Sequence, residues 1–344
     1  MEVIYLELSD SQSHKFYEVT VNNAEVSIRY GRIGTQGQTS NTTYDTPEKA
    51  QADATKKINE KLKKGYLQAT LKETPQFMRD LPRKFIPMKK LLEESLKPYI
   101  KITPGEKVGD MNNLSYPDAN GDPLTLWQSK IGGNPYFPKN VEYPIDRITG
   151  QAMPLLIQIN CADVPQIAGF DFPPQGILQF YLGFEPADAQ CTPEKYRVLY
   201  FSEISEDEND LITDFSFIEN IGTILEFYDD VYPLSFSVSH DVFWESRYGY
   251  ELEIPEELAE LSQEFDEWIS DYDYENDTHI RGDKLGGYVD FHSDVNEIAE
   301  RAKGKLLLEF SHPFNSDDSF YFFIEDARLS KRDFSEVEFY FVCD

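Results

Sequence analysis

The sequence predicts an α+β fold in two parts: a small antiparallel sheet with one helix, followed by a larger mixed α+β domain rich in antiparallel strands. Short stretches of β-branched and aromatic residues, separated by turn residues, recur along most of the chain. Helical patterns are few and do not alternate regularly with these stretches, which argues against a doubly wound parallel sheet. The net charge of −30 is unevenly distributed, which indicates two parts with different surfaces.

The charge divides the chain near residue 75. Residues 1–75 hold ten acidic and ten basic side chains, so the whole net charge of −30 belongs to the residues that follow. We therefore expect a first domain over residues 1–75, a linker over 76–85 and an acidic α+β domain over 86–344. Because an acidic surface repels phosphate backbones, any contact with DNA or RNA is expected in the first domain.

Four strands and one helix account for the first domain. Alternating apolar and polar residues predict strands at residues 3–8, 14–21 and 25–33, with a turn at Asn22-Asn23, and residues 38–44 predict a fourth. Thr46-Pro47-Glu48 is typical of a helix start, and Gly65 of the residue beyond a helix end. One face of this helix is apolar and the opposite face is a lysine stripe: Ala50, Ala54, Ile58 and Leu62 against Lys49, Lys56 and Lys63.

The stretch from Arg29 to Gln38, R-Y-G-R-I-G-T-Q-G-Q, is the part of the first domain whose residue types indicate a binding chemistry. Glycines recur at every third position, which suits backbone with positive φ or close packing. Between them, Tyr30 offers an aromatic face for a base or sugar, and Arg32 offers a guanidinium for a phosphate. The alternative is a tight hairpin with a core tyrosine and a surface arginine, beside a lysine stripe that is an ordinary solvated helix face.

This loop, followed by a helix that ends in Lys63-Lys64-Gly65-Tyr66, resembles the WGR domain of poly(ADP-ribose) polymerases and of many bacterial proteins. The resemblance covers roughly residues 1–75 and implies binding of DNA or RNA. Tyr30 stands where the family has its name-giving tryptophan, so the stacking face is smaller. Together with the lysine stripe, the resemblance predicts a nucleic-acid-binding site made of Tyr30, Gly31, Arg32, Gly34, Lys56 and Lys63.

The second domain is expected to be rich in strands. Helices are predicted at residues 87–99 and 255–271, where apolar residues recur at spacings of three and four. Between the first helix and the strands, residues 103–125 are dense in Pro, Gly, Asn and Asp and predict loops. β-branched and aromatic residues predict strands at residues 153–160, 176–184, 195–202, 223–227, 232–239, 305–310, 319–324 and 337–342.

Two double-glycine loops are candidate ligand sites in the second domain. Each has a lysine two residues before the glycine pair, and glycines of this kind let backbone amides approach an anion. Tight turns at strand ends explain the same residues. The similarity of the loops also indicates two related halves. The predicted ligand-binding residues are Lys130, Gly132 and Gly133 in one loop and Lys284, Gly286 and Gly287 in the other.

Residues 82–344 resemble the YwqG-like family of uncharacterised bacterial proteins. The resemblance is carried by the two double-glycine loops, by Gly176-Ile177-Leu178-Gln179-Phe180 and by Leu306-Leu307-Leu308 with Phe320-Tyr321-Phe322-Phe323-Ile324. The chain departs from the family at Tyr288-Val289-Asp290, where a proline is usual. No activity is implied by the resemblance.

Catalytic, metal and cofactor signals are weak. The five histidines share no zinc-binding spacing, and Ser239-His240-Asp241 is consecutive on a predicted strand, so its side chains point to opposite faces. The acidic run that begins at Asp271 lacks the glycine and the final glutamate of a calcium loop. We therefore expect no catalytic residue, no metal and no cofactor. Three scattered cysteines and the lack of an apolar run of about 18 residues predict a cytoplasmic protein without a membrane span.

Three functions remain open. The first is a bacterial accessory or regulatory protein with a nucleic-acid-binding module and a protein- or ligand-binding domain. The second is an immunity-type protein whose acidic domain over residues 86–344 neutralises a basic protein partner, such as a toxin nuclease. The third is an enzyme that binds a phosphorylated substrate at the double-glycine loops.

Overall fold

The computed structural model describes residues 2–9, 14–32, 37–69, 75–111, 121–183, 194–218, 230–242, 254–276, 283–289, 302–312 and 315–343. Internal contacts divide the chain into two units. The first unit consists of Met1–Leu92 and Ile254–Asn276, and the second of Glu93–Glu253 and Asp277–Asp344. The predicted α+β class is confirmed, whereas the predicted domain boundaries at residues 75 and 85 stay a prediction.

The first unit contains a five-stranded antiparallel sheet. Its strands are β1 (Glu2–Ser9), β2 (His14–Asn22), β3 (Glu25–Arg32), β4 (Gln38–Thr43) and β5 (Leu67–Ala69), in the order β4-β3-β2-β1-β5. The four predicted strands are confirmed, and β5 was missed because three residues carry no periodicity. The turn between β2 and β3 is Asn23-Ala24, one residue later than predicted, since Asn22 pairs with Glu25.

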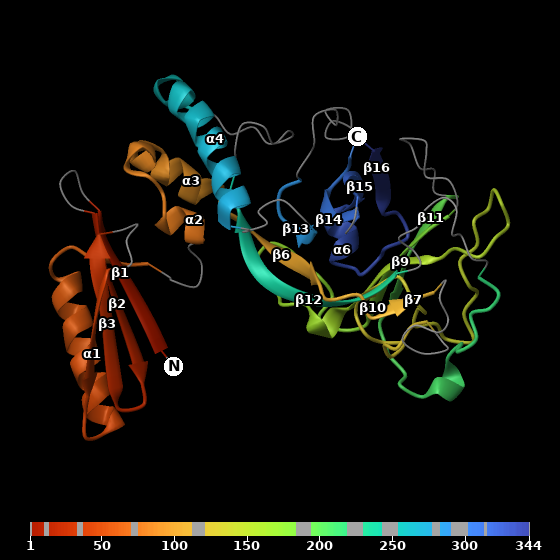
Figure 1. The fold of residues 1–344 in the computed structure, drawn as a ribbon, viewed down its shortest axis with the longest axis horizontal. Coiled ribbons are helices and arrows are strands. Elements are labelled where there is room, and N and C mark those ends of the chain that lie inside the picture. Colours follow the sequence, from red (N-terminus) through yellow and green to blue (C-terminus); the bar gives the residue numbers. More distant parts are fainter. Residues whose placement is uncertain are drawn as a thin grey trace. The chain divides into compact units, whose positions relative to one another are not determined.

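Helix α1 (Pro47–Leu62) lies along one face of this sheet (Figure 1). As predicted, Thr46 is the N-cap, and its hydroxyl accepts a hydrogen bond from the Lys49 amide at 3.3 Å. The core under the helix is made by Leu6, Val19, Val26, Ile28, Ala50, Ala54 and Tyr66, with Ile58 packed against it. Leu62 was expected on the apolar face but is 38% exposed, because the helix ends there.

The remaining helices of the first unit form a separate aromatic cluster. They are α2 (Gln76–Arg79), the 3-10 turns Arg83–Met88 and Glu256–Leu258, and α4 (Ala259–Asn276), which confirms the helix predicted after Pro255. Phe85 packs edge-on against Phe265 of α4 at 5.4 Å between ring centroids. The helix predicted over residues 87–99 ends early: α3 covers Lys89–Ser95 and a strand follows, because Pro98 disfavours helical backbone at the residue before it.

The second unit is built on one eleven-stranded antiparallel sheet, whose strand order is β11-β10-β9-β8-β12-β6-β13-β14-β15-β16, with β7 paired to β12. All predicted strands within the described residues are confirmed, and the one predicted over 223–227 lies outside them. The strands missed are β6, β7, β8 and β13. The bounds are β6 (Lys97–Pro104), β7 (Gly109–Asp110), β8 (Lys130–Ile131), β9 (Leu155–Asn160), β10 (Ile177–Leu182), β11 (Tyr196–Phe201), β12 (Asp230–Asp241), β13 (Lys284–Gly286), β14 (Lys305–His312), β15 (Asn315–Ile324) and β16 (Glu338–Cys343).

The strand order of the second unit is symmetric. One half consists of β6 to β11 and the other of β12 to β16. Their first strands, β6 and β12, pair with each other at the centre of the sheet. Each of them also pairs with a double-glycine strand of the other half, β12 with β8 and β6 with β13. The runs β8-β9-β10-β11 and β13-β14-β15-β16 then extend outward on the two sides. This exchange of first strands agrees with the prediction of two related halves.

Candidate nucleic-acid interface

Tyr30 lies on the helix-covered face of the first sheet but beyond the part that is buried. Residues two apart on a strand share a face, and Val26 and Ile28 on that face of β3 are buried in the core. Tyr30 is next in the series and is 44% exposed. The alternative of a core tyrosine is therefore wrong. The apolar face of β3 is buried at Val26 and Ile28 and becomes exposed to solvent at Tyr30.

The ring of Tyr30 is held by its neighbours on both adjacent strands. Tyr17 lies opposite on β2, with 6.3 Å between the ring centroids and 32° between the planes. The Tyr30 hydroxyl donates to the Gln38 side-chain oxygen on β4 at 3.3 Å. On the other side, the Lys61 ammonium lies 4.2 Å from the Tyr17 ring centroid and 5.2 Å from that of Tyr66. These contacts give Tyr30 a defined orientation.

Positive charges lie near this aromatic pair, together with the carboxylates of Asp53 and Glu60. Lys15 lies opposite Arg32 in the β2–β3 register, two residue pairs beyond Tyr17 and Tyr30 and therefore on the same face. Both side chains are exposed. Burial against the rings lowers the pKa of Lys61, and the ammonium groups of Lys64 and Lys15 lower it further, while the Glu60 carboxylate raises it. We call Tyr30, Arg32, Lys15, Lys61 and Lys64 the tyrosine patch.

The other face of the same strands is neutralised. Arg29 forms an ion pair with Glu18 at 2.7 Å and its guanidinium lies 4.6 Å from the Phe16 ring centroid. Gly31 lies opposite Phe16 in the β2–β3 register. Gly37 packs directly against the Phe16 ring and leaves no space there for a Cβ. The ion-paired Arg29 is thus turned away from Tyr30, and Gly31 and Gly37 serve packing around Phe16. Gly34 lies outside the described residues.

We expect Gly37→Ala to destabilise the sheet. Gly37 has a φ of +70°, and a Cβ there would lie 2.5 Å from Cζ of Phe16 and 2.7 Å from the Tyr30 carbonyl oxygen. Positive φ alone costs about 1–2 kcal/mol, and the clash adds to it. Gly65→Ala is the matched control, since Gly65 has a φ of +87° and its nearest neighbour is Leu8 at 3.6 Å. In urea unfolding, equal losses for the two variants would contradict the prediction.

The structure does not place all the predicted lysines in the patch. Lys56 on α1 and Lys63 at its C-cap are both exposed. Lys56 is two residues from the buried Ala54, and Lys63 is two residues from Lys61. Two residues correspond to just over half a helical turn, so both lysines lie on the outer side of the helix. Lys61 and Lys15 were missed by the sequence reasoning. The signal was present: Lys61 follows the buried Ala54 by seven residues, and Lys15 alternates with Tyr17 and Val19.

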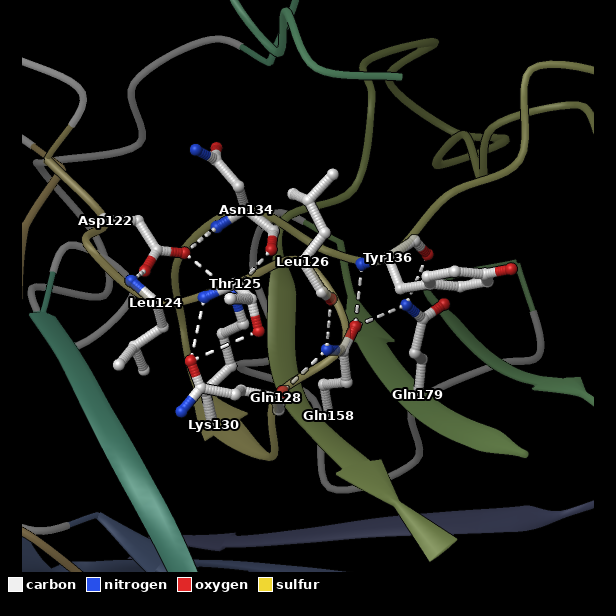
Figure 2. A network of polar contacts seen from close by, with 10 residues as sticks. All are labelled: Asp122, Leu124, Thr125, Leu126, Gln128, Lys130, Asn134, Tyr136, Gln158 and Gln179. Atoms are coloured by element: carbon white, nitrogen blue, oxygen red, sulfur yellow. Dashed lines mark hydrogen bonds and ion pairs between the residues drawn. The ribbon is translucent and has the colours of Figure 1, made fainter. Parts of the chain in front are cut away.

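The first double-glycine loop holds a carboxylate of the chain itself (Figure 2). The buried Lys130 ammonium lies 2.9 Å from Oδ2 of Asp122 and also donates to the Asn134 carbonyl at 2.9 Å. The same Oδ2 accepts the Asn134 amide at 2.8 Å, and Oδ1 accepts the Leu124 amide at 2.9 Å. Gly133 has a φ of +72° and a Cβ there would lie 2.4 Å from Oδ2. Glycine is needed so that the backbone can wrap the carboxylate.

The second double-glycine loop repeats this arrangement. The buried Lys284 ammonium lies 3.3 Å from Oδ2 of Asp241, which accepts the Tyr288 amide at 3.0 Å. Gly287 has a φ of +80°, and a Cβ there would lie 2.6 Å from the same oxygen. Gly132 and Gly286 also have positive φ. Both loops therefore surround an internal aspartate, and roles for Lys130, Gly132, Gly133, Lys284, Gly286 and Gly287 toward an external ligand stay predictions.

A glutamine pair links the first loop to the sheet. Gln158 on β9 lies opposite Lys130, and its side-chain oxygen accepts the Tyr136 amide at 2.8 Å and the Gln179 side-chain amide at 2.7 Å. Its own amide donates to the carbonyls of Leu126 and Gln128, both at 2.8 Å (Figure 2). All these groups are satisfied within the chain, which marks the network as structural.

The remaining features concern a metal site, a reactive cysteine and a membrane span. In the part of the chain that the structure describes, no group of three or more His, Cys, Asp or Glu side chains is placed to hold a metal ion. Cys161 is buried, and burial raises the pKa of its thiol to about 12. Within the described ranges, no helix is both long and apolar enough to cross a membrane. The expectations of no catalytic residue, no cofactor and a cytoplasmic location stay predictions.

Comparison with known proteins gives two partial matches. The protein YehF of Escherichia coli strain K12 is 26% identical over 132 residues, which cover 35% of this chain and 40% of YehF, so the chain spans less than half of that relative. A solved structure from Bacteroides fragilis is 28% identical over 24% of this chain and 22% of its own, with a TM-score of 0.21, which is too low to carry an argument.

Two family models match the chain. The WGR domain model matches residues 2–73, which confirms the resemblance of the first domain. The model described as "Domain of unknown function (DUF1963)" matches residues 129–343, well over half of the chain. The finer name YwqG-like stays a prediction. The chain therefore carries a WGR domain and belongs to the family defined by the domain of unknown function DUF1963.

Proposed function

We propose that this protein is an accessory or regulatory protein that binds nucleic acid through the tyrosine patch of its WGR domain. The observation that carries the proposal is the exposed ring of Tyr30, held in place by Tyr17 and Gln38 and lying near Lys15, Arg32, Lys61 and Lys64. The DUF1963 domain is proposed to bind a protein or ligand. It adds no attraction for a polyanion, because residues beyond 75 carry the whole net charge of −30.

The patch combines the two interactions through which proteins bind nucleic acid without reading its sequence, which are aromatic stacking and phosphate neutralisation. An aromatic side chain stacked on a base contributes about 1–3 kcal/mol. Lysines and arginines that neutralise phosphates release counterions and make the affinity depend on salt. Because Tyr30 is already oriented by its neighbours, little side-chain entropy is lost on binding. A smaller face than tryptophan reduces the stacking term but not the charge term.

We expect Tyr30→Ala to weaken nucleic-acid binding about tenfold or more, with the salt dependence unchanged. Lys15→Ala is expected to weaken binding to all sequences alike and to reduce the slope of log K against log salt by about one. The measurement is fluorescence anisotropy of the full chain with blunt-ended, nicked and single-stranded DNA and with RNA, at several salt concentrations.

Lys56→Ala provides the matched control, since Lys56 is an exposed lysine of the same domain on the outer side of α1. If Lys56→Ala weakens binding as much as Lys15→Ala, the lysine stripe rather than the tyrosine patch is the interface. Binding that survives Tyr30→Ala and Lys15→Ala unchanged, or that is absent at low salt, would overturn the proposal.

A further inference from the structure

The second double-glycine loop brings two carboxylates to one buried ammonium. Oδ2 of Asp241 lies 3.3 Å from Nζ of Lys284, and Oε2 of Glu309 lies 3.8 Å from the same nitrogen. The side chains of Lys284 and Asp241 are 0% exposed, and that of Glu309 is 4% exposed. The centroid of the buried Tyr99 ring is 5.4 Å from Nζ. An amine and two carboxyl groups therefore meet in a place that the fold shields from water.

Three strands of the second unit supply these groups. Asp241 is the last residue of β12, Lys284 is the first of β13, and Glu309 on β14 lies opposite Lys284 in the register. β12 and β13 pair with the two sides of β6, so the Lys284 side chain spans that strand to reach Asp241. A covalent bond between these side chains would hold β6, the first strand of one half, between two strands of the other.

The first double-glycine loop provides a contrast within the same chain. Among the described residues, Asp122 is the one carboxylate within ion-pair distance of Lys130, at 2.9 Å. Both Asp122 oxygens accept backbone amides, from Leu124 and Asn134, which favours the charged form of that carboxyl. The two loops thus share the lysine and the aspartate, and the second loop adds the carboxyl group of Glu309.

Burial makes the charged form of the second cluster costly. Ions that leave water regain the lost hydration energy only through close ion pairs, and 3.3 Å is longer than the charge-assisted hydrogen bonds of about 2.7–2.9 Å that are usual. Lys97, opposite Asp241 on β6, is a second cation nearby: burial lowers the pKa of Lys97, and the Asp241 charge raises it. Transfer of one proton from Lys284 to Asp241 leaves an uncharged amine beside an uncharged carboxyl, the two forms that condense to an amide.

We propose that Lys284 and Asp241 join in an intramolecular isopeptide bond, with Glu309 as the proton carrier. After the Lys284 ammonium has given one proton to Asp241, the amine attacks Cγ of the carboxyl. Glu309 takes a proton from the attacking nitrogen and returns it to the leaving hydroxyl. A C–N bond forms, a C–O bond breaks, one water molecule leaves, and Glu309 ends as the carboxylate with which it began.

The fold itself supplies the conditions for this step. Reacting groups held about 3–3.5 Å apart react far faster than the same groups free in solution. The amide removes two opposite charges from the interior, and its burial protects it from hydrolysis. No cofactor or second substrate is needed, and the proposal does not depend on nucleic-acid binding.

The test is the intact mass of the denatured full chain, measured by mass spectrometry after purification and again after prolonged incubation at neutral pH. We expect the mass to lie below the sequence mass by the mass of one water molecule. Protease digestion and tandem mass spectrometry are expected to yield a branched peptide that joins Lys284 to Asp241.

Three variants assign the roles. Lys284→Arg keeps the positive charge but removes the amine, and Glu309→Gln removes the proton carrier with little change of shape, so both are expected to retain the full sequence mass. Lys130→Arg is the matched control and is expected to lose water as the wild-type chain does. Thermal unfolding checks that the variants fold.

Several results would overturn the proposal. A wild-type chain that keeps its full sequence mass at both times would show an ordinary ion pair, whether or not the variants fold. A branched peptide that starts from Lys97 or Lys130, or a loss of water that persists in Lys284→Arg, would place the link elsewhere. A Glu309→Gln chain that loses water as fast as the wild-type chain would overturn the role given to Glu309.

Discussion

Lys130→Met is expected to lower the free energy of unfolding by about 3–5 kcal/mol, because it leaves the buried Asp122 carboxylate without its counter-ion. The Lys130 and Asp122 side chains are 0% and 1% exposed. Burial lowers the pKa of Lys130, while the Asp122 charge raises it. Each charge is therefore tolerated in the interior only while the other is present. Lys284→Met is expected to have a similar effect through Asp241 and Glu309, which lie 3.3 and 3.8 Å from its ammonium.

The measurement is urea unfolding followed by circular dichroism. The double variant Lys130→Met with Asp122→Asn removes both charges, keeps the side-chain acceptor for the Leu124 amide and is expected to recover part of the loss. A loss below about 1 kcal/mol for Lys130→Met would show that the ion pair is not structural. Loss of phosphate binding with unchanged stability would instead support the prediction that the double-glycine loops capture an external anion.

Asp283→Asn is expected to stabilise the protein at pH 8. Removal of the carboxyl from water raises the pKa of Asp283 to about 7, although a hydrogen bond from the Ser311 amide at 2.7 Å opposes this. In the unfolded chain the group ionises near pH 4. The folded state therefore binds the proton more tightly, and stability falls as pH rises between about 4 and 7, then stays constant.

Asparagine keeps an oxygen for the Ser311 amide and carries no charge. The gain from Asp283→Asn should therefore grow by about 2 kcal/mol between pH 5.5 and pH 8, since one pKa unit corresponds to about 1.4 kcal/mol. Glu206→Gln, at an exposed position of the same unit, controls for the loss of one negative charge from an acidic chain. A gain that is independent of pH, or matched by Glu206→Gln, would contradict the expectation.

Local chemistry was enough to predict most of the strands and the two main helices. Alternation located β1 to β3, and the pair Thr46-Pro47 located the start of α1. These elements are long enough for a period to emerge and are bounded by turn or capping residues. β8 and β13 have two and three residues and carry no period. β6 was hidden because its first residues continue an amphipathic helix pattern, and Pro98 alone marks the change.

The sequence by itself determined the two-part organisation and the WGR-like loop. The structure decided that Tyr30 is exposed rather than part of the core. The tertiary structure alone decided which charges act together. Strand register places Lys15 beside Arg32, and helix packing brings Lys61 onto Tyr17. Folding also pairs Lys284 with Asp241, 43 residues away. Periodicity reports the local backbone, whereas the partner of a charge depends on contacts between segments that are distant in the chain.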